Sequence, residues 1–274
     1  MSTPVSTDLT PTRLKRQPDI QLPGGECSIW DLAVVSPDML LVSNNSKQCV
    51  QLLDCLKGEV VSKVQLHDFW GKPYRMCLAN RNTAAVSVGY STIQMINVRD
   101  KTLTIGRQLT ASRIIHGLRS CRNYLVVSYD SQPYLQKISM DGNILPPYGM
   151  SGKSQQFIYP SFMCTTPGGS VFISDNGTNT ITKVDVSFNI RQTFTSPLLK
   201  EPYGITAVTE DQILVCSNRN HSIVLLQPST NTMSTLLGKD DGIKDPYTLT
   251  YCPDQKKVYV ASDITDTINV YQLL

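Results

Sequence analysis

Hydrophobic and polar positions along this 274-residue chain alternate in short runs, and the runs recur as a unit. Each unit holds a β-branched run that ends in a small residue, then a polar turn and a second apolar run. The small residues are serines, between 41 and 46 residues apart: Ser43, Ser87, Ser128, Ser174, Ser217 and Ser262. A further alternating segment precedes each serine, and four of these segments open with proline, at Pro73, Pro160, Pro202 and Pro246. Four short strands in about 40–45 residues make one propeller blade, so the pattern predicts an all-β fold, a six-bladed β-propeller.

A helical solenoid is the alternative for a repeat of this length. It would need apolar residues at i, i+3, i+4 and i+7 over ten or more residues, and no stretch of the chain has this pattern. The turn signals GG at 168–169, NG at 176–177 and DG at 141–142 favour strands instead.

The two ends of the chain are predicted to meet. The last unit reaches Leu274 after only three strands, and the segment RLKRQPDIQLP at residues 13–23 can supply the fourth. Such pairing closes the ring and removes an exposed sheet edge. Pro18 and Pro23 are tolerated only on an outer strand of this kind. We therefore expect residues 1–12 to form a flexible segment and residues 13–274 to form one propeller.

The charge balance does not indicate wholesale binding to nucleic acid. The chain has 25 basic and 22 acidic residues, a net charge of +3, although a one-sided distribution could still create a basic face. No apolar run approaches the ~20 residues that span a bilayer, and the first twenty residues lack the apolar centre of a secretory signal. The sequence predicts a cytoplasmic protein that does not bind a membrane.

The eight cysteines form no C-x-x-C pair, and most lie inside apolar runs. A small thiol in such a run packs as a hydrophobic residue, so we expect reduced, structural cysteines and no disulfide framework.

Several segments resemble the NHL repeat. The match is carried by Glu201-Pro-Tyr-Gly-Ile-Thr-Ala-Val with Gln212-Ile-Leu-Val-Cys-Ser-Asn, and by Pro160 with Val171-Phe-Ile-Ser-Asp-Asn-Gly. It spans about residues 28–274 and is degenerate in the second and third units. The aspartate of the repeat is kept at Asp175 and Asp263, where a turn-closing role is expected.

The resemblance is greatest to the C-terminal propellers of tripartite-motif (TRIM) proteins. It implies a non-catalytic binding module, the substrate-recognition domain of a TRIM-like E3 ubiquitin ligase. The paired Cys/His ligands of a RING or B-box are absent from this sequence, so ligase chemistry cannot reside in these residues.

Propeller loops that gather around the central channel are the expected recognition surface, because function is concentrated on loops held by a rigid scaffold. Aromatic and cationic residues interleave there and suit both protein and RNA partners. The predicted binding face consists of Trp70, Lys72, Tyr74, Arg75, Arg113, Tyr129, Tyr159, Tyr203, Arg219, His221 and Tyr247. The tyrosines at 74, 203 and 247 each follow a proline that opens a unit, and they form either a packing ring or a binding rim.

A protein is the preferred partner of a propeller that is itself monomeric. Single-stranded or stem-loop RNA, bound as in post-transcriptional regulation, is the first alternative, and DNA is not expected. The near-neutral charge favours protein, because contact with several phosphates draws on concentrated Lys and Arg.

A metal-dependent propeller hydrolase or lyase is the second alternative. A zinc site needs at least three good ligands, whereas His67, His116 and His221 are scattered along the chain. Glu26 before Ile29 and Trp30 faintly resembles the start of calcium-dependent lactonase propellers, but the later ligands have no counterpart. Neither a G-x-S-x-G elbow nor a nucleotide-binding loop occurs. We therefore expect no catalytic residues, no metal and no cofactor.

Overall fold

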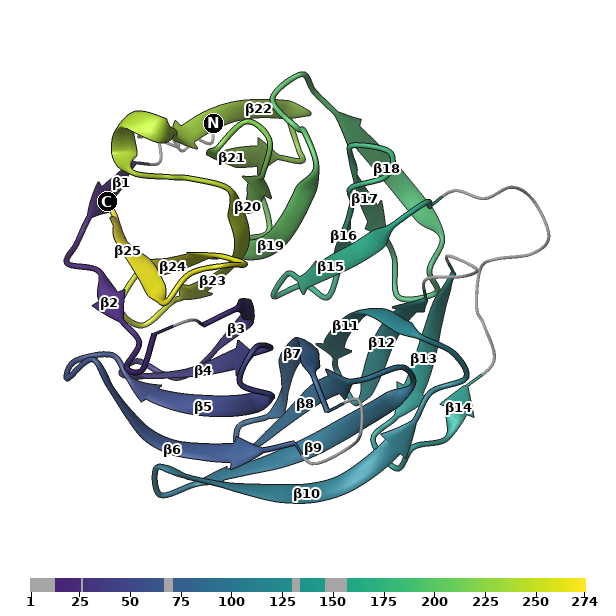
Figure 1. Ribbon diagram of the computed structural model, residues 1–274. Coiled ribbons are helices and arrows are strands. Elements are labelled where there is room, and N and C mark those ends of the chain that lie inside the picture. The colour runs from purple at the N-terminus through teal and green to yellow at the C-terminus, as the bar shows by residue number, and fades with distance from the viewer. Residues whose placement is uncertain (1–12, 26, 67–70, 130–133, 146–156) are drawn as a thin grey trace, which may run out of the picture.

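The computed structural model confirms the six-bladed β-propeller: six antiparallel sheets surround a central channel (Figure 1). The structure describes residues 13–25, 27–66, 71–129, 134–145 and 157–274. Blade 1 consists of β3 (Ile29–Ser36), β4 (Met39–Asn44), β5 (Cys49–Asp54) and β6 (Glu59–Gln65). Blade 2 consists of β7 (Pro73–Asn80), β8 (Thr83–Val88), β9 (Thr92–Arg99) and β10 (Thr102–Thr110). Blade 3 consists of β11 (Ile115–Cys121), β12 (Tyr124–Tyr129), β13 (Leu135–Ser139) and β14 (Ile144–Leu145).

The other three blades follow the same order from the channel outward. Blade 4 consists of β15 (Pro160–Thr165), β16 (Val171–Asp175), β17 (Thr180–Val184) and β18 (Ile190–Thr195). Blade 5 consists of β19 (Pro202–Thr209), β20 (Gln212–Ser217), β21 (Ser222–Gln227) and β22 (Thr232–Leu237), and a short 3₁₀ turn, η1 (Lys239–Asp241), follows it. Blade 6 has β23 (Pro246–Cys252), β24 (Lys257–Ser262) and β25 (Thr267–Leu273).

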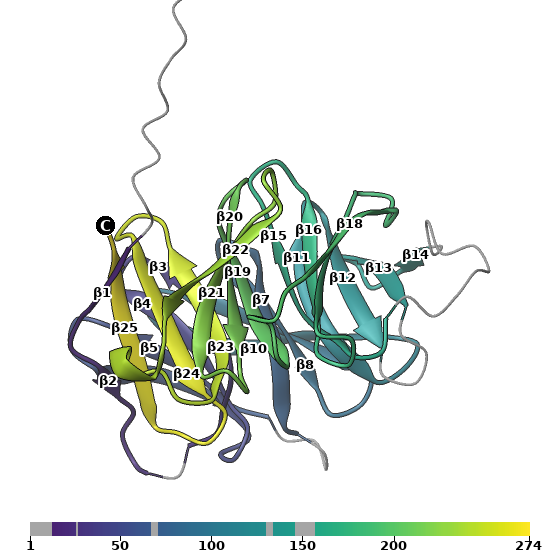
Figure 2. The ribbon, with the colours of Figure 1, turned by 90° about the horizontal axis from the view of Figure 1, so that it is seen from above.

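The N-terminal segment completes blade 6, as the sequence predicts. Both β1 (Leu14–Arg16) and β2 (Ile20–Gln21) pair antiparallel with β25, at the outer edge of the ring (Figure 2). Leu14 lies opposite Leu273, and Ile20 lies opposite Ile268. The ring is therefore closed by strands from both ends of the described chain, which hides the edge of β25.

The core lies between the blades. Five of six hydrophobic clusters draw their buried side chains from two neighbouring blades and the segments beside them. The sixth joins blades 4 and 5 and also includes Tyr247 of blade 6. Leu41 of blade 1 and Val86 of blade 2, for example, are both fully buried in one cluster. Alternation along the strands produces this arrangement, because successive side chains point to opposite faces of a sheet and each face meets another blade.

Three of the serines that mark the repeat, Ser43, Ser128 and Ser174, link adjacent blades. The Ser217 and Ser262 hydroxyls donate instead to the segments that precede their own blades. The Ser174 hydroxyl donates a hydrogen bond to the Tyr203 carbonyl at 2.6 Å, and the Ser128 hydroxyl donates to the Pro160 carbonyl at 2.5 Å. In both pairs the acceptor belongs to the innermost strand of the next blade. In blades 1, 3 and 4 a small hydroxyl residue therefore joins one blade to the next.

All eight cysteines are free, and seven of them are buried. Burial raises the pKa of the Cys77 and Cys164 thiols to about 12, so these side chains pack as uncharged groups. Within the described ranges, no helix is long and apolar enough to cross a bilayer.

Candidate functional site

Residues at one position of the innermost strands gather around one mouth of the channel. This position is the second residue of β3, β7, β11, β15, β19 and β23, directly after the residue that opens each strand. It is occupied in blade order by Trp30, Tyr74, His116, Ser161, Tyr203 and Tyr247. Five of the six side chains carry an aromatic ring, so the propeller symmetry alone brings these rings together.

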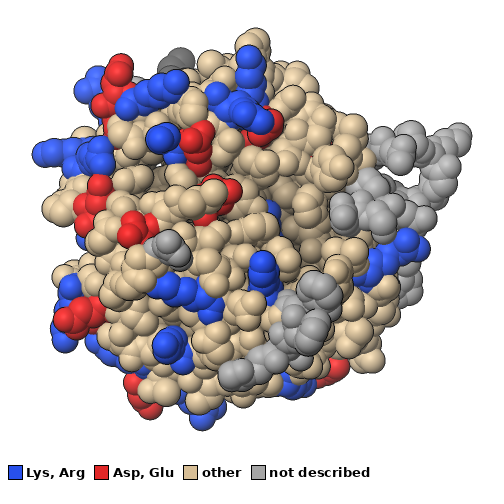
Figure 3. Space-filling view, viewed as in Figure 1, with Lys and Arg blue, Asp and Glu red and all other residues tan. Residues whose placement is uncertain are grey.

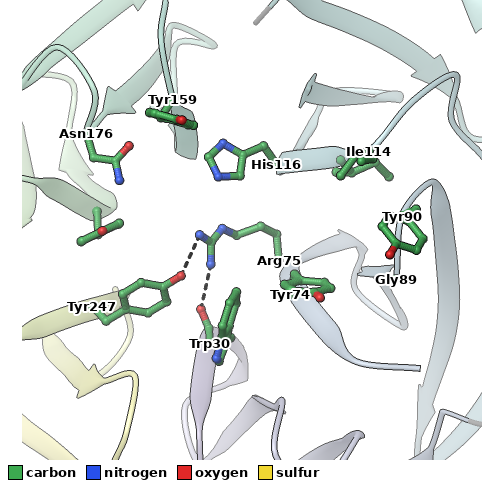
Figure 4. A pocket seen from close by; sticks show the side chains of 12 residues that line it. Trp30, Tyr74, Arg75, Gly89, Tyr90, Ile114, His116, Tyr159, Asn176 and Tyr247 are labelled. Carbon is green, nitrogen blue, oxygen red and sulfur yellow. Dashed lines mark hydrogen bonds between the residues drawn. The ribbon is translucent and has the colours of Figure 1, made fainter. Parts of the chain in front are cut away.

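The rings surround a pocket of about 460 Å³ (Figure 4). Every blade except blade 4 contributes its second residue to the lining of this pocket. Blade 4 contributes Tyr159 and Asn176 instead. The pocket is lined by Trp30, Tyr74, Arg75, Gly89, Tyr90, Ile114, Ile115, His116, Tyr159, Asn176, Tyr203 and Tyr247. A concave site of this size with a largely aromatic wall is typical of ligand and side-chain binding.

Ring contacts hold the aromatic wall in place. The Trp30 ring packs edge-on against Tyr74 at a centroid distance of 4.9 Å and against Tyr247 at 5.7 Å. The Tyr203 and Tyr247 rings lie 4.9 Å apart. Aromatic pairs at these separations stabilise one another beyond the area that they bury, so one side of the mouth is preorganised.

Arg75 closes the floor of this pocket. Its side chain is only 4% exposed, and its guanidinium lies 3.6 Å from the Phe162 ring centroid. Nε donates to the Ser161 carbonyl at 3.0 Å, and Nη1 donates to the Trp30 carbonyl at 3.2 Å. Nη2 donates to the Tyr247 hydroxyl at 3.1 Å. One side chain of blade 2 thereby connects blades 1, 4 and 6 across the channel.

The carboxylate of Asp31 opposes the charge of Arg75 without forming an ion pair with it. Asp31 is buried beside the channel, where its carboxylate accepts hydrogen bonds from Met76 N at 2.7 Å and from the Thr248 hydroxyl at 3.0 Å. Burial raises the pKa of Asp31, and the positive charge of Arg75 opposes that rise. Among the described residues, no carboxylate lies within 4 Å of Arg75, and two of the five guanidinium N–H groups make no hydrogen bond.

The turn aspartate of the repeat shapes the rim in blade 4. Asp175 is fully buried, and its carboxylate accepts hydrogen bonds from Ile158 N at 2.7 Å and from Tyr159 N at 2.9 Å. It also accepts from Gly177 N at 3.0 Å within its own turn, as expected of a turn-closing aspartate. The result is that Ile158 and Tyr159 stand on the surface, 50% and 48% exposed.

The pocket has an apolar rim on one side and a charged rim on the other. Blades 2 to 4 contribute exposed Tyr90, Ile114, Ile158 and Tyr159. Toward blades 5 and 6, an adjoining polar pocket of about 540 Å³ shares Tyr203 and Tyr247 with the aromatic pocket. It is also lined by Glu201, Arg219, Lys244, Asp245 and Asp263. This face of the ring is therefore amphipathic, with the aromatic pocket between its apolar and charged sides.

Positive and negative side chains are interspersed over the face onto which the aromatic pocket opens, and its described residues form no continuous positive area (Figure 3). Arg219 pairs with Glu201 at 2.9 Å, and His221 lies 3.1 Å from Asp245. The hydrogen bond to Glu201 raises the pKa of Arg219.

Five of the residues predicted from sequence come together at the aromatic pocket: Tyr74, Arg75, Tyr159, Tyr203 and Tyr247. Arg219 lines the adjoining polar pocket, and His221 lies beside it through Asp245. Lys72 and Arg113 are exposed and do not line either pocket. Trp70 lies outside the described residues.

The structure places two predicted residues differently from the expected surface. Tyr129 is fully buried at the end of β12, where its hydroxyl donates to Gln136 and its ring packs 5.0 Å from Tyr134. Strand alternation turns this side chain into the cluster between blades 2 and 3. Arg75 is likewise buried, and contributes as the floor of the pocket and not as an exposed rim.

Trp30, His116 and Asn176 line the pocket but are missing from the predicted face. Trp30 and His116 occupy the same position as the predicted tyrosines, but their strands open with Ile29 and Ile115 where the others have proline. The interval from this position to the marker serine varies from 12 to 15 residues, so counting back from the serines would not have aligned them either. For Asn176 the sequence offered only the NG turn at 176–177, which does not indicate a place in the pocket.

The described part of the chain contains no group of three or more His, Cys, Asp or Glu side chains placed to hold a metal ion. The aromatic pocket offers one imidazole, from His116, and its ring lies 5.9 Å from that of Tyr159.

No family model matches the chain, and no curated protein matches it either. Solved structures do. Virginiamycin B lyase from Staphylococcus aureus is 14% identical over 96% of this chain and 100% of that one, with a TM-score of 0.67. A protein of unknown function from Bacteroides thetaiotaomicron is 12% identical over 96% of this chain and 77% of that one, with a TM-score of 0.73.

The β-propeller domain of Cps50 (Swd1) from Myceliophteria thermophila is 13% identical over 90% of this chain and 83% of that one, with a TM-score of 0.65. At these identities the likeness shows the propeller fold and nothing finer. The comparisons thus support the propeller fold, and no NHL or TRIM family model matches the chain.

Proposed function

We propose that this propeller is a non-catalytic binding module that recruits a protein partner through its aromatic channel mouth. One observation supports this above all: five rings from five blades converge on a preorganised pocket whose rim includes exposed apolar side chains. Tyrosine and tryptophan in such pockets dominate the energetics of protein interfaces, and contiguous exposed apolar residues mark interaction sites.

The residues at the floor of the pocket limit the kind of partner side chain that can enter it. The Arg75 guanidinium already stacks on Phe162 and faces the Trp30 and Tyr247 rings at 5.9 Å and 5.3 Å. The pocket therefore disfavours a cationic side chain and favours an apolar or aromatic one with an oxygen acceptor beside it. An extended segment of the partner, with one such side chain inserted, satisfies both the ring wall and the remaining N–H groups of Arg75.

Protein is favoured over RNA by the distribution of charge. Acidic and basic side chains alternate on the pocket face (Figure 3), and Arg219 is paired with Glu201. Tight binding along an RNA backbone would draw on several unpaired cations. RNA recognition through base stacking on the tyrosines is the competing proposal.

The sequence resemblance to TRIM propellers supports a finer version of this role, as the substrate-recognition domain of a TRIM-like ubiquitin ligase. In that version the propeller selects a target and catalysis resides in other domains. Its readout is ubiquitination of the selected protein by a full-length ligase, lost when the aromatic pocket is altered.

The binding proposal is tested by selecting peptides from a random library on the propeller, and by offering a random single-stranded RNA pool in parallel. We expect peptides with an aromatic or apolar residue near a carboxylate, whose affinity falls about tenfold or more in Tyr203→Ala. Lys57→Ala, an exposed residue of blade 1 remote from the pocket, is the matched control. RNA binding that weakens steeply with salt, without any selected peptide, would replace this proposal by the RNA alternative.

A second candidate function is a propeller lyase or hydrolase. It is favoured by His116, whose imidazole lines the pocket beside Tyr159, and by the fold shared with virginiamycin B lyase. Metal analysis after dialysis distinguishes it. A stoichiometric divalent ion that is lost in His116→Ala would support the enzyme, and a metal-free protein that binds the selected peptides supports the module.

A further inference from the structure

The opposite mouth of the channel holds a second pocket, of about 560 Å³. It lies where the innermost strands end, and it is lined by the last residues of these strands and by the turns that follow. A constriction of about 20 Å³, lined by Arg75, Asp31 and Arg119 among others, separates it from the aromatic mouth. The two mouths are therefore distinct sites on opposite faces of the ring.

Arg119 projects into this second pocket from β11 and is half-buried. It lies at the same level as Cys77 and Cys164 of the neighbouring blades, each four residues after the residue that opens its strand. The positive charge of Arg119 opposes the burial that raises the pKa of both thiols. The guanidinium makes no hydrogen bond to a described residue, and no described carboxylate lies within 4 Å of it.

Hydroxyl groups face the same space. Thr206 and Thr250 occupy the position equivalent to Arg119 in blades 5 and 6, and both line the pocket and the constriction above it. Neither hydroxyl is hydrogen-bonded to a described residue. A partly buried guanidinium with free donors, surrounded by free hydroxyls, is the donor set that proteins use for carboxylate and phosphate oxygens.

Among the described residues, the channel supplies no close counterion to Arg119. Its described lining holds two cations, Arg75 and Arg119, against one buried carboxylate, that of Asp31. The Asp31 oxygens are already engaged by Met76 N, Leu32 N and the Thr248 hydroxyl. Asp254 lines the outer rim of the pocket but is exposed to solvent. An unpaired, partly buried cation is costly, and an anion from outside would relieve that cost.

We propose that this second mouth binds a small oxyanion, a carboxylate or a phosphate group, through Arg119 and the hydroxyls of Thr206 and Thr250. The site is independent of the aromatic pocket, and a propeller that carries both can hold a partner on one face and an acidic small molecule or acidic group on the other.

The test is an NMR titration of the ¹⁵N-labelled full chain with inorganic phosphate and, separately, with acetate, at constant ionic strength. We expect saturable shifts of the Thr206 and Thr250 amides with at least one of the two ions. Saturation by phosphate alone assigns a phosphate site, and saturation by acetate assigns a carboxylate site. In Arg119→Gln the affinity should fall about 10- to 100-fold, as expected for loss of charge-assisted hydrogen bonds.

Arg122→Gln is the matched control, because Arg122 is exposed in the turn directly after β11 and does not line the pocket. It should leave the affinity unchanged. Asp254→Asn should strengthen binding about two- to fivefold, because it removes a negative charge from the rim. Absence of saturable shifts with both ions, or equal affinity in wild type and Arg119→Gln, would overturn the proposal.

The double variant Thr206→Val with Thr250→Val provides a second test that keeps the arginine. Its affinity should fall about tenfold, and an unchanged affinity would contradict the proposed hydroxyl contacts even if Arg119→Gln does not fold.

Discussion

At one mouth of the channel Arg75 is enclosed by aromatic rings and hydrogen-bonded to three other blades, whereas at the other mouth Arg119 lies among threonines without a hydrogen bond to a described residue. Both arginines come from innermost strands of adjacent blades. We infer from this difference that a cation in the channel stabilises the fold where the protein supplies its hydrogen-bond acceptors. Where the protein does not supply them, the cation can bind a ligand that does.

The largest expected difference between the mouths is in stability. Arg75→Met removes three hydrogen bonds and leaves Asp31 without its nearby cation, so we expect unfolding free energy to fall by about 3–5 kcal/mol. Arg119→Met should change it by less than about 1 kcal/mol, because no described acceptor loses a partner. Urea denaturation of the two variants measures both values, and equal losses would remove the contrast between architecture and recognition.

A smaller loss of stability is expected when the tyrosine hydroxyl that accepts a hydrogen bond from Arg75 is removed. Tyr247→Phe keeps the ring but removes the acceptor of Nη2, which should cost about 1–2 kcal/mol in urea denaturation. Tyr251→Phe, at the other mouth, removes a hydroxyl with no described partner and should change stability by about 0.5 kcal/mol or less. If Tyr251→Phe proves the more destabilising, the aromatic mouth is not the more tightly organised one.

Replacement of Asp31 should change how steeply the stability varies with pH, and not only the stability at one pH. Because burial raises the pKa of Asp31, the folded protein binds this proton more tightly than the unfolded chain does. The resulting stabilisation is fully present below the unfolded pKa of about 3.9 and is lost as the pH rises through the folded value.

Wild type should therefore lose stability relative to Asp31→Asn as the pH is raised through this window. Thermal unfolding of both proteins across a pH series measures the difference. Parallel curves over the whole series would show that the Asp31 carboxyl titrates with the same pKa in the folded and unfolded states.

The fold could be predicted from sequence because the repeat is a property of spacing. The marker serines recur at nearly constant intervals, and three of them donate a hydrogen bond to the next blade, as Ser128 and Ser174 do. Ring closure was predictable for a similar reason, since a missing fourth strand and an unassigned N-terminal segment imply one another.

The aromatic site was predictable only in part. Tyr74, Tyr203 and Tyr247 follow a proline and could be aligned with one another, whereas Trp30 follows an isoleucine and could not. Whether the next residue enters the channel depends on β-bulges in the innermost strands, such as the register shift between Pro73 and Met76. Period alone does not give such shifts, which explains why the burial of Arg75 and the placement of Arg119 emerged only from the structure.

The central claim, that the aromatic mouth and not the opposite mouth receives the protein partner, is tested most directly by the affinity of a selected peptide for two aromatic variants. Trp30→Ala removes a ring that contacts both Tyr74 and Tyr247, and it should weaken binding by about 2 kcal/mol, or roughly 30-fold. Tyr251→Ala, at the opposite mouth, should leave the affinity unchanged. Unaltered binding to Trp30→Ala, or loss of binding in Tyr251→Ala, would contradict the account.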